Sequence, residues 1–208
     1  MRKLVTGIAA ASALALTIGA AGPAAAEGTT SLAEVLTSDG DQFDKDWNDF
    51  DIVTEAVLAV LAAKPDSPVK ALTDGSFAAT AFVPNDRAFQ KLVRDLTGKK
   101  YKKEKNVFKK VAGLGIDTVE TVLLYHVVPG TVPAATALTL DDVRVKTVLG
   151  KTFKVNVVND GTQIRLKDKD RNSRNPRVIA TDVNAGNMQI AHVIDRVLRP
   201  LDLPPTVH

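Results

Sequence analysis

Residues 80–89 read Thr-Ala-Phe-Val-Pro-Asn-Asp-Arg-Ala-Phe, and they join two kinds of secondary structure. The apolar run that ends at Val83 is typical of a buried strand, and Pro84 is a residue that ends strands. Asn85 can accept a hydrogen bond from the next backbone turn, which favours the start of a helix. Phe82 and Phe89 can enter the core on either side of the junction. The segment therefore predicts a strand that leads directly into a helix.

Two further segments place a histidine on an apolar face. Residues 123–130 read Leu-Leu-Tyr-His-Val-Val-Pro-Gly, and residues 190–200 read Ile-Ala-His-Val-Ile-Asp-Arg-Val-Leu-Arg-Pro. An unpaired polar group on such a face costs roughly 1–3 kcal/mol, so we expect His126 and His192 to be hydrogen-bonded structural residues. Asp195 lies on the opposite face of a regular strand from His192, and we expect it to accept hydrogen bonds from backbone donors.

Together, in this order, the three segments resemble the signature blocks of the fasciclin domain (FAS1) family, in its single-domain bacterial secreted type. The resemblance covers about residues 30–201, with 202–208 as a C-terminal tail, and Gln189 departs from it by replacing a glycine. It implies N-terminal helices packed on an antiparallel β-sandwich or wedge, and adhesion through an exposed face. The residues that it marks as structural or interaction residues are Phe82, Pro84, Asn85, Phe89, Tyr125, His126, His192 and Asp195.

The periodicity of the chain changes near its middle. Helical spacing of apolar residues dominates up to Tyr125, and Ser31 and Glu34 form a capping box at the start of the first helix. After that point the chain favours strands over residues 143–149, 152–158, 162–166, 178–183 and 190–198, with a hairpin turn at 159–161. Helices followed by strands indicate an α+β fold with an antiparallel sheet, and the absence of a linker favours one domain.

The first 26 residues have the pattern of a secretory signal peptide. Arg2 and Lys3 precede an apolar run, and Ala24-Ala25-Ala26 forms a cleavage site. We expect a secreted, extracellular product, with an uncleaved membrane anchor as the alternative. The sequence has no cysteine, which excludes disulfides and cysteine-linked lipid anchors. No later stretch is apolar and long enough to span a bilayer.

The sequence offers few groups for catalysis or for a cofactor. It contains three histidines, and none of its serines lies in a G-x-S-x-G motif. It also lacks H-E-x-x-H and similar zinc-binding spacing. We therefore expect no enzyme, no cofactor and no metal site. The acidic segment 39–51 fails the EF-hand spacing, because Phe50 stands at the twelfth position. A solvated acidic loop is the favoured interpretation, and a looser calcium site is the alternative.

Two other segments carry concentrated charge. Residues 99–110 hold seven lysines against Glu104, and residues 167–177 alternate in sign and end basic. We expect both to be solvated loops between regular elements. An alternative is that Lys99, Lys100, Lys102 and Lys103 bind a polyanion, with an affinity that falls with salt. Export from the cytoplasm argues against a nucleic acid as that partner.

The resemblance to the fasciclin family, beside the lack of catalytic motifs, implies a non-catalytic adhesion or interaction module at the cell surface or in the extracellular matrix. Its partner would be a cell-surface or matrix protein or a polysaccharide, and the sequence does not indicate the oligomeric state. Two alternatives stay open. One is a small-ligand-binding protein with an apolar crevice between the helices and the sheet, and the other is an extracellular hydrolase.

Overall fold

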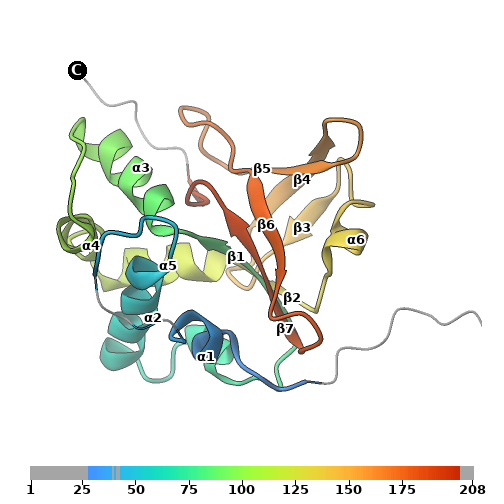
Figure 1. Cartoon of the computed structure of the whole chain (residues 1–208), viewed down its shortest axis with the longest axis horizontal. Helices are drawn as coiled ribbons and strands as arrows, with labels where there is room; N and C mark the ends of the chain where they lie inside the picture. Colours follow the sequence, from blue (N-terminus) through green and yellow to red (C-terminus); the bar gives the residue numbers. More distant parts are fainter. Residues whose placement is uncertain (1–27, 39, 41–42, 202–208) are drawn as a thin grey trace, which may run out of the picture.

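The computed structural model describes residues 28–38, 40 and 43–201. The predicted signal peptide, residues 1–26, and the predicted tail, 202–208, lie outside the described residues. Helices α1–α5 gather on one side of the molecule and two β-sheets on the other (Figure 1). None of the helices in the described part has the length and apolar character needed to cross a membrane.

The helical half is built from elements whose ends are set by local chemistry. Ser31 and Glu34 form the predicted capping box of α1, and Asn85 caps α3 through its side chain. Gly98 ends α3 in the left-handed conformation, at φ 69°, where glycine is favoured. The helices are α1 (Leu32–Leu36), α2 (Asp51–Ala63), the 3₁₀ helix η1 (Pro68–Thr73), α3 (Asp86–Thr97), α4 (Glu104–Ala112), α5 (Ile116–Tyr125) and α6 (Ala134–Ala137).

The strands form two sheets. A four-stranded sheet has the order β2-β1-β7-β6, and a three-stranded sheet has the order β3-β4-β5. Their bounds are β1 (Ala79–Pro84), β2 (Val127–Pro129), β3 (Arg144–Lys146), β4 (Thr152–Val158), β5 (Gln163–Lys167), β6 (Val178–Val183) and β7 (Gln189–Ile194). The α+β class is confirmed.

The larger sheet is mixed, which corrects the expectation of an antiparallel sheet. β1 runs parallel to β7, with Ala79 opposite Gln189 and Pro84 opposite Ile194. Parallel neighbours need a long crossover connection, and here the connection contains helices α3–α6 and the whole second sheet. Every residue of both strands is buried, as in strands that are covered on both faces.

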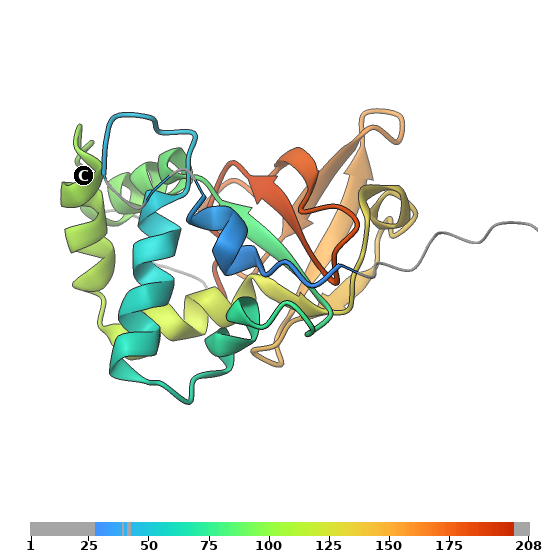
Figure 2. The same ribbon diagram turned by 60° about the horizontal axis from the view of Figure 1, so that its bottom comes forward.

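Two hydrophobic clusters lie on opposite faces of the four-stranded sheet. The helical core joins α1–α5 to one face and includes Ala81, Val83 and Phe89. The sheet core fills the space between the two sheets and includes Phe82, Tyr125 and Phe153. Alternate residues of β1 therefore point into different cores, as the pleat of a strand requires. Figure 2 shows the same division into a helical side and a sheet side.

The prediction of a solvated loop over residues 99–110 was wrong for its second half. Residues 104–112 form α4, which contributes Val107 and Val111 to the helical core while its lysines stay exposed. The end of the acidic segment is not solvated, because Asp51 is buried as the first residue of α2. Phe43, Trp47 and Phe50 pack against the helical core and hold residues 43–50 to the protein.

Candidate functional site

His126 lies at the end of α5 and is almost fully buried. The amide of Leu198 donates to its Nε2 at 2.9 Å, so Nδ1 carries the proton and donates to the carbonyl of Val122 at 2.7 Å. Burial lowers its pKa to about 4, and the Val122 carbonyl opposes this shift. His126 is therefore a neutral residue that ties α5 to the segment after β7.

Acid is expected to destabilise the fold through His126. Its unfolded pKa of 6.5 lies above the folded value of about 4, so between these values the unfolded chain binds a proton that the folded one does not. As the pH decreases through this window, the free energy of unfolding should decrease by about 1.4 kcal/mol per pH unit, or roughly 3 kcal/mol in all. Urea unfolding of wild type and His126→Gln at pH 7 and pH 4.5 measures this. Equal pH dependence in the two proteins would contradict the assignment.

His192 occupies a similar position in β7. It is fully buried, its Nε2 lies 2.9 Å from the carbonyl of Val132, and the amide of Asp182 reaches its Nδ1 at 3.4 Å. Its ring packs against Phe82 with the centroids 5.6 Å apart. Both histidines thus use both ring nitrogens in contacts with the backbone, and within the described residues neither is hydrogen-bonded to a nucleophile. The third histidine, His208, lies outside the described residues.

The other residues of the first two blocks also lie inside the protein. Phe82 meets Phe153 edge to face, and Phe89 belongs to the helical core. Pro84 is buried at the end of β1, and Asn85 accepts a hydrogen bond from the amide of Ala88 at 3.0 Å.

Tyr125 extends this set into the sheet core. Its hydroxyl donates to the carbonyl of Thr152 at 3.0 Å, and burial raises its pKa. All of these block residues are buried, so a partner would have to bind elsewhere.

Asp195 is the block residue that approaches the surface. The backbone amide of Arg177 donates to its Oδ1 at 2.8 Å, and the Arg177 guanidinium donates to its Oδ2 at 3.2 and 3.3 Å. Lys91 lies on its other side, with Nζ 2.8 Å from its carbonyl oxygen. Asp195 therefore accepts from the backbone, as the strand alternation predicts, and it also fixes two cationic side chains.

A basic cleft of about 620 Å³ opens beside Asp195. Its cationic residues come from α3, β5, the 168–177 loop and the end of β7, and they are Lys91, Arg165, Arg174, Arg177 and Arg196. Asp195 is the one carboxylate in the lining, which Ser173 and Asn175 complete. Desolvation lowers the pKa of Lys91, and nearby arginines lower it further while Asp195 opposes them. The cleft therefore concentrates positive charge in a concave surface.

Two arginines of the basic cleft lack a counter-charge. Within the described part of the chain, Arg165 and Arg174 form no ion pair, whereas Arg177 pairs with Asp195 and Arg196 with Asp95. The backbones of Arg165 and Arg177 also face each other across an isolated bridge between neighbouring segments. An anion that enters the cleft would find guanidinium groups already close together.

The lysines that the sequence marked as polyanion-binding lie elsewhere. Lys99, Lys100, Lys102 and Lys103 are all exposed in the connection between α3 and α4, and none lines the basic cleft. The backbone beside them is held, because Gln90 donates to the carbonyl of Tyr101 at 2.7 Å. These lysines form a separate positive surface.

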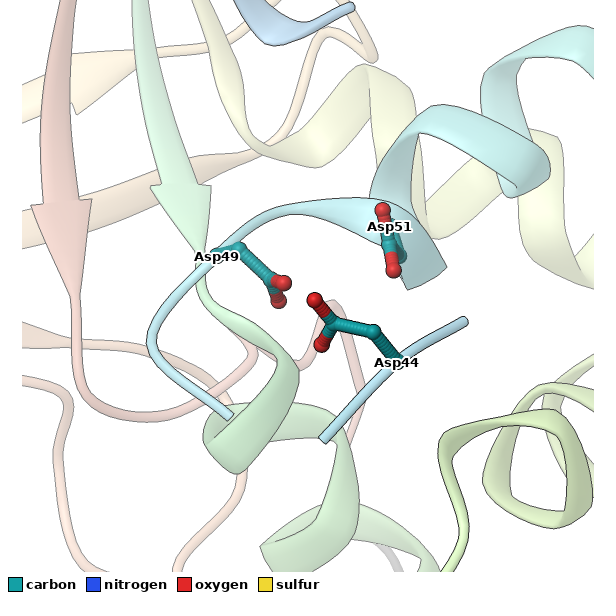
Figure 3. Close-up of side chains that lie close together, drawn as sticks. All are labelled: Asp44, Asp49 and Asp51. Atoms are coloured by element: carbon teal, nitrogen blue, oxygen red, sulfur yellow. The ribbon is translucent and has the colours of Figure 1, made fainter. Parts of the chain in front are cut away.

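Acidic side chains also gather, at a place separate from the two positive surfaces. Carboxylate oxygens of Asp44, Asp49 and Asp51 lie within 4.8 Å of one another, and Figure 3 shows the three side chains turned toward a common point. Asp51 also belongs to a second group, with Asp86 and Glu104, at the same spacing. We call these five residues the acidic cluster. Sequence reasoning missed it because Asp86 and Glu104 lie far from the acidic segment.

An apolar cavity lies between the helices and β1. It is lined by residues of the helical core together with His126, and its volume is about 50 Å³. A cavity of about 150 Å³ is needed for a molecule of the size of benzene. The cavity between the helices and β1 is therefore smaller than one that holds a benzene-sized molecule.

Comparisons with known proteins identify the family of the chain. No curated protein matches the chain. Among solved structures, it is similar to a FAS1 domain pair from the insect cell adhesion molecule fasciclin I, with 20% identity and a TM-score of 0.43. The match covers 69% of this chain and 44% of that one, so the chain spans less than half the length of this neighbour. The family model of the fasciclin domain matches residues 54–200, and the chain therefore belongs to the fasciclin domain family.

Proposed function

We propose that this protein is a secreted, non-catalytic interaction module that binds anionic groups of a cell-surface or matrix partner through the basic cleft. Fasciclin domains are generally adhesion or interaction modules. The observation that carries the proposal is the gathering of five cationic side chains around one carboxylate in a cleft of about 620 Å³.

The chemistry of the cleft favours a partner that carries sulfate, phosphate or carboxylate groups. Guanidinium groups donate two parallel hydrogen bonds to such anions, and they are less strongly hydrated than lysine. Arg165 and Arg174 can offer this geometry without breaking an ion pair in the described structure. A concave lining also focuses the electrostatic field and attracts an anionic polymer from a distance. A polysaccharide or an acidic protein surface fits these requirements.

The state of the histidines supports a binding role over a catalytic one. His126 and His192 are buried and fully hydrogen-bonded, so neither can act as a base for an exposed nucleophile. Ser31 caps α1, and Ser67 is bonded to Glu120. The small size of the apolar cavity likewise gives no support to the alternative of small-ligand binding.

Removal of two arginines from the basic cleft should weaken binding to a sulfated polysaccharide. Dextran sulfate serves as the probe, and calorimetry at several salt concentrations measures its affinity for the mature protein. We expect Arg165→Ser/Arg174→Ser to lose about tenfold in affinity, and to show a shallower dependence on salt than wild type.

A second double variant separates the basic cleft from the exposed lysines. Lys100→Ser/Lys102→Ser removes the same charge from the connection between α3 and α4, and we expect its affinity to stay within about twofold of wild type. The opposite ranking of the two variants would move the binding site to the lysines. Binding that does not depend on salt would contradict an electrostatic contact altogether.

A further inference from the structure

Three helices begin at carboxylates that face one another. Asp51, Asp86 and Glu104 are the first residues of α2, α3 and α4, and one oxygen of each lies within 4.8 Å of the others. All three side chains are buried. Asp44 and Asp49, in the loop before α2, have carboxylate oxygens within 4.8 Å of one of Asp51, and they form the outer part of the acidic cluster (Figure 3).

The carboxylates of Glu104 and Asp86 lack the partners that buried charge requires. Glu104 is 1% exposed, and neither of its carboxylate oxygens accepts a normal hydrogen bond within the described residues. Asp86 is fully buried. Its Oδ1 accepts from the amide of Ile52 at 3.0 Å, and its Oδ2 has no such partner in the described part. Burying an ionised carboxylate in this way is costly unless a cation joins it or a proton neutralises it.

The surroundings of the acidic cluster add negative charge. Desolvation, reinforced by neighbouring carboxylates, raises the pKa of Asp86 to about 8 and that of Asp49 to about 7. Desolvation and the same neighbours raise the pKa of Glu104, although the backbone of Asp44 opposes them weakly. The largest charge interactions of these three residues are with other carboxylates.

We propose that the acidic cluster is a binding site for a divalent cation of the calcium type, held by Asp49, Asp51, Asp86 and Glu104, with Asp44 on the side of the solvent. All the ligand atoms are carboxylate oxygens, which suits a hard cation and does not suit zinc or copper. Calcium binds oxygens at about 2.3–2.6 Å, so two ligands of one ion can be separated by up to about 5 Å. The spacing of 4.8 Å falls within this range.

Binding of the ion would connect four separate parts of the helical half. The loop before α2 already contacts α3, because the amide of Asp86 donates to the carbonyl of Asp49 at 3.1 Å and that of Arg87 to the carbonyl of Trp47 at 2.9 Å. It also contacts α4, where the ring of Phe43 lies 5.4 Å from that of Phe108. A bound cation adds a shared charged centre to these contacts. It should therefore stabilise the fold and order this loop against α3 and α4.

Calorimetry and thermal unfolding test the site directly. The mature protein is stripped with EDTA and titrated with calcium chloride, with magnesium chloride in a parallel titration. We expect calcium to release binding heat at a single site and to raise the melting temperature at millimolar concentration. Magnesium should bind more weakly, because it requires a smaller, nearly octahedral site and keeps its waters. Magnesium binding as tight as that of calcium would contradict the calcium assignment.

Two variants distinguish cation binding from a structural role of the carboxylates. Glu104→Gln and Asp49→Asn keep the shape of each side chain, and each should weaken calcium binding by at least about tenfold. Without calcium, Glu104→Gln should melt no lower than wild type, because it removes an uncompensated buried charge. The control Glu55→Gln lies on α2 away from the acidic cluster and should bind calcium like wild type.

The proposal fails if millimolar calcium neither releases heat nor changes the melting temperature of wild type. It also fails if Glu104→Gln and Asp49→Asn both bind calcium with the affinity of Glu55→Gln. If Glu104→Gln does not fold, the comparison of Asp49→Asn with Glu55→Gln decides, since Asp49 is only partly buried and lies in a loop.

Discussion

Replacement of Arg199 by methionine is expected to lower the free energy of unfolding by about 3–5 kcal/mol. The Arg199 side chain is 8% exposed, and its Nη1 donates to Oδ2 of Asp170 at 2.7 Å. Asp170 is fully enclosed, and its other contact comes from the amide of Asn172 at 2.8 Å. Methionine would leave this carboxylate buried without a cation, and that penalty accounts for the large effect.

Arg199 also fixes the position of α3. Its Nη2 donates to Asp95 of α3 at 2.6 Å, and its backbone amide donates to Asp168 at 2.8 Å. One side chain thus connects α3, the 168–177 loop and the segment after β7. Denaturant unfolding measures the loss of stability. The matched control is Arg196→Met, which removes a longer contact of 3.4 Å to Asp95, and it should lower the free energy of unfolding by less than about 1 kcal/mol.

A double substitution shows whether the unpaired charge is the cause. Arg199→Met/Asp170→Met removes both partners, and it should recover most of the stability that Arg199→Met loses, because no isolated charge stays buried. A double variant that is less stable than Arg199→Met would instead assign the loss to packing.

Replacement of Gln189 by alanine is expected to cost about 2–4 kcal/mol, because its amide satisfies buried backbone groups in two other elements. Its Oε1 accepts from the amide of Leu32 in α1 at 2.8 Å. Its Nε2 donates to the carbonyls of Ala71 at 2.6 Å and Asp74 at 2.8 Å, in and after η1. The side chain is fully buried, so water cannot replace these bonds.

Denaturant unfolding and hydrogen exchange test this role of Gln189. The amide of Leu32 should lose protection in Gln189→Ala more than amides of the β3-β4-β5 sheet. Gln163→Ala provides the control, since this glutamine is partly exposed in β5 and its removal should change stability by less than about 0.5 kcal/mol. Equal costs for the two variants would show that the buried amide contributes little.

Local chemistry made many elements predictable. The Ser31 capping box, the Asn85 cap and the Gly98 terminus each depend on residues next to one another, and the structure confirms all three. The hairpin at residues 159–161 is confirmed too, since Asn159 and Asp160 adopt the positive φ values that such a turn requires. Patterns of this kind need no knowledge of the rest of the fold.

Features that depend on distant contacts were not predictable in the same way. The helical pattern of α4 is weak in the sequence, because its buried apolar residues Val107 and Val111 stand among several charged residues. The parallel pairing of β1 and β7 leaves no pattern in the sequence, since every residue of both strands is buried and no alternation marks the direction of pairing. In the sequence, Gln189 is a departure from the family pattern. Its three hydrogen bonds go to α1 and to residues in and after η1, which lie more than one hundred positions away along the chain.

The basic cleft and the acidic cluster were not predictable from the sequence for the same reason. The cationic side chains of the basic cleft come from α3, β5, the 168–177 loop and the segment at the end of β7. A run of charge in one segment of the sequence therefore reveals only part of the cleft. The acidic cluster depends on Glu104, which stands alone among lysines in the sequence. Spacing rules find sites that are built from one segment, and these sites are built from several.

The central pairing of β1 with β7 has a consequence for the order of folding. These neighbouring strands lie more than one hundred positions apart along the chain, so a long loop must close before their ladder forms. Until β7 is present, β1 has a hydrogen-bonded neighbour on one side alone, the short strand β2. Nascent chains that end before residue 189 therefore cannot complete either core, and a late, slow step in folding should coincide with the arrival of the last strand.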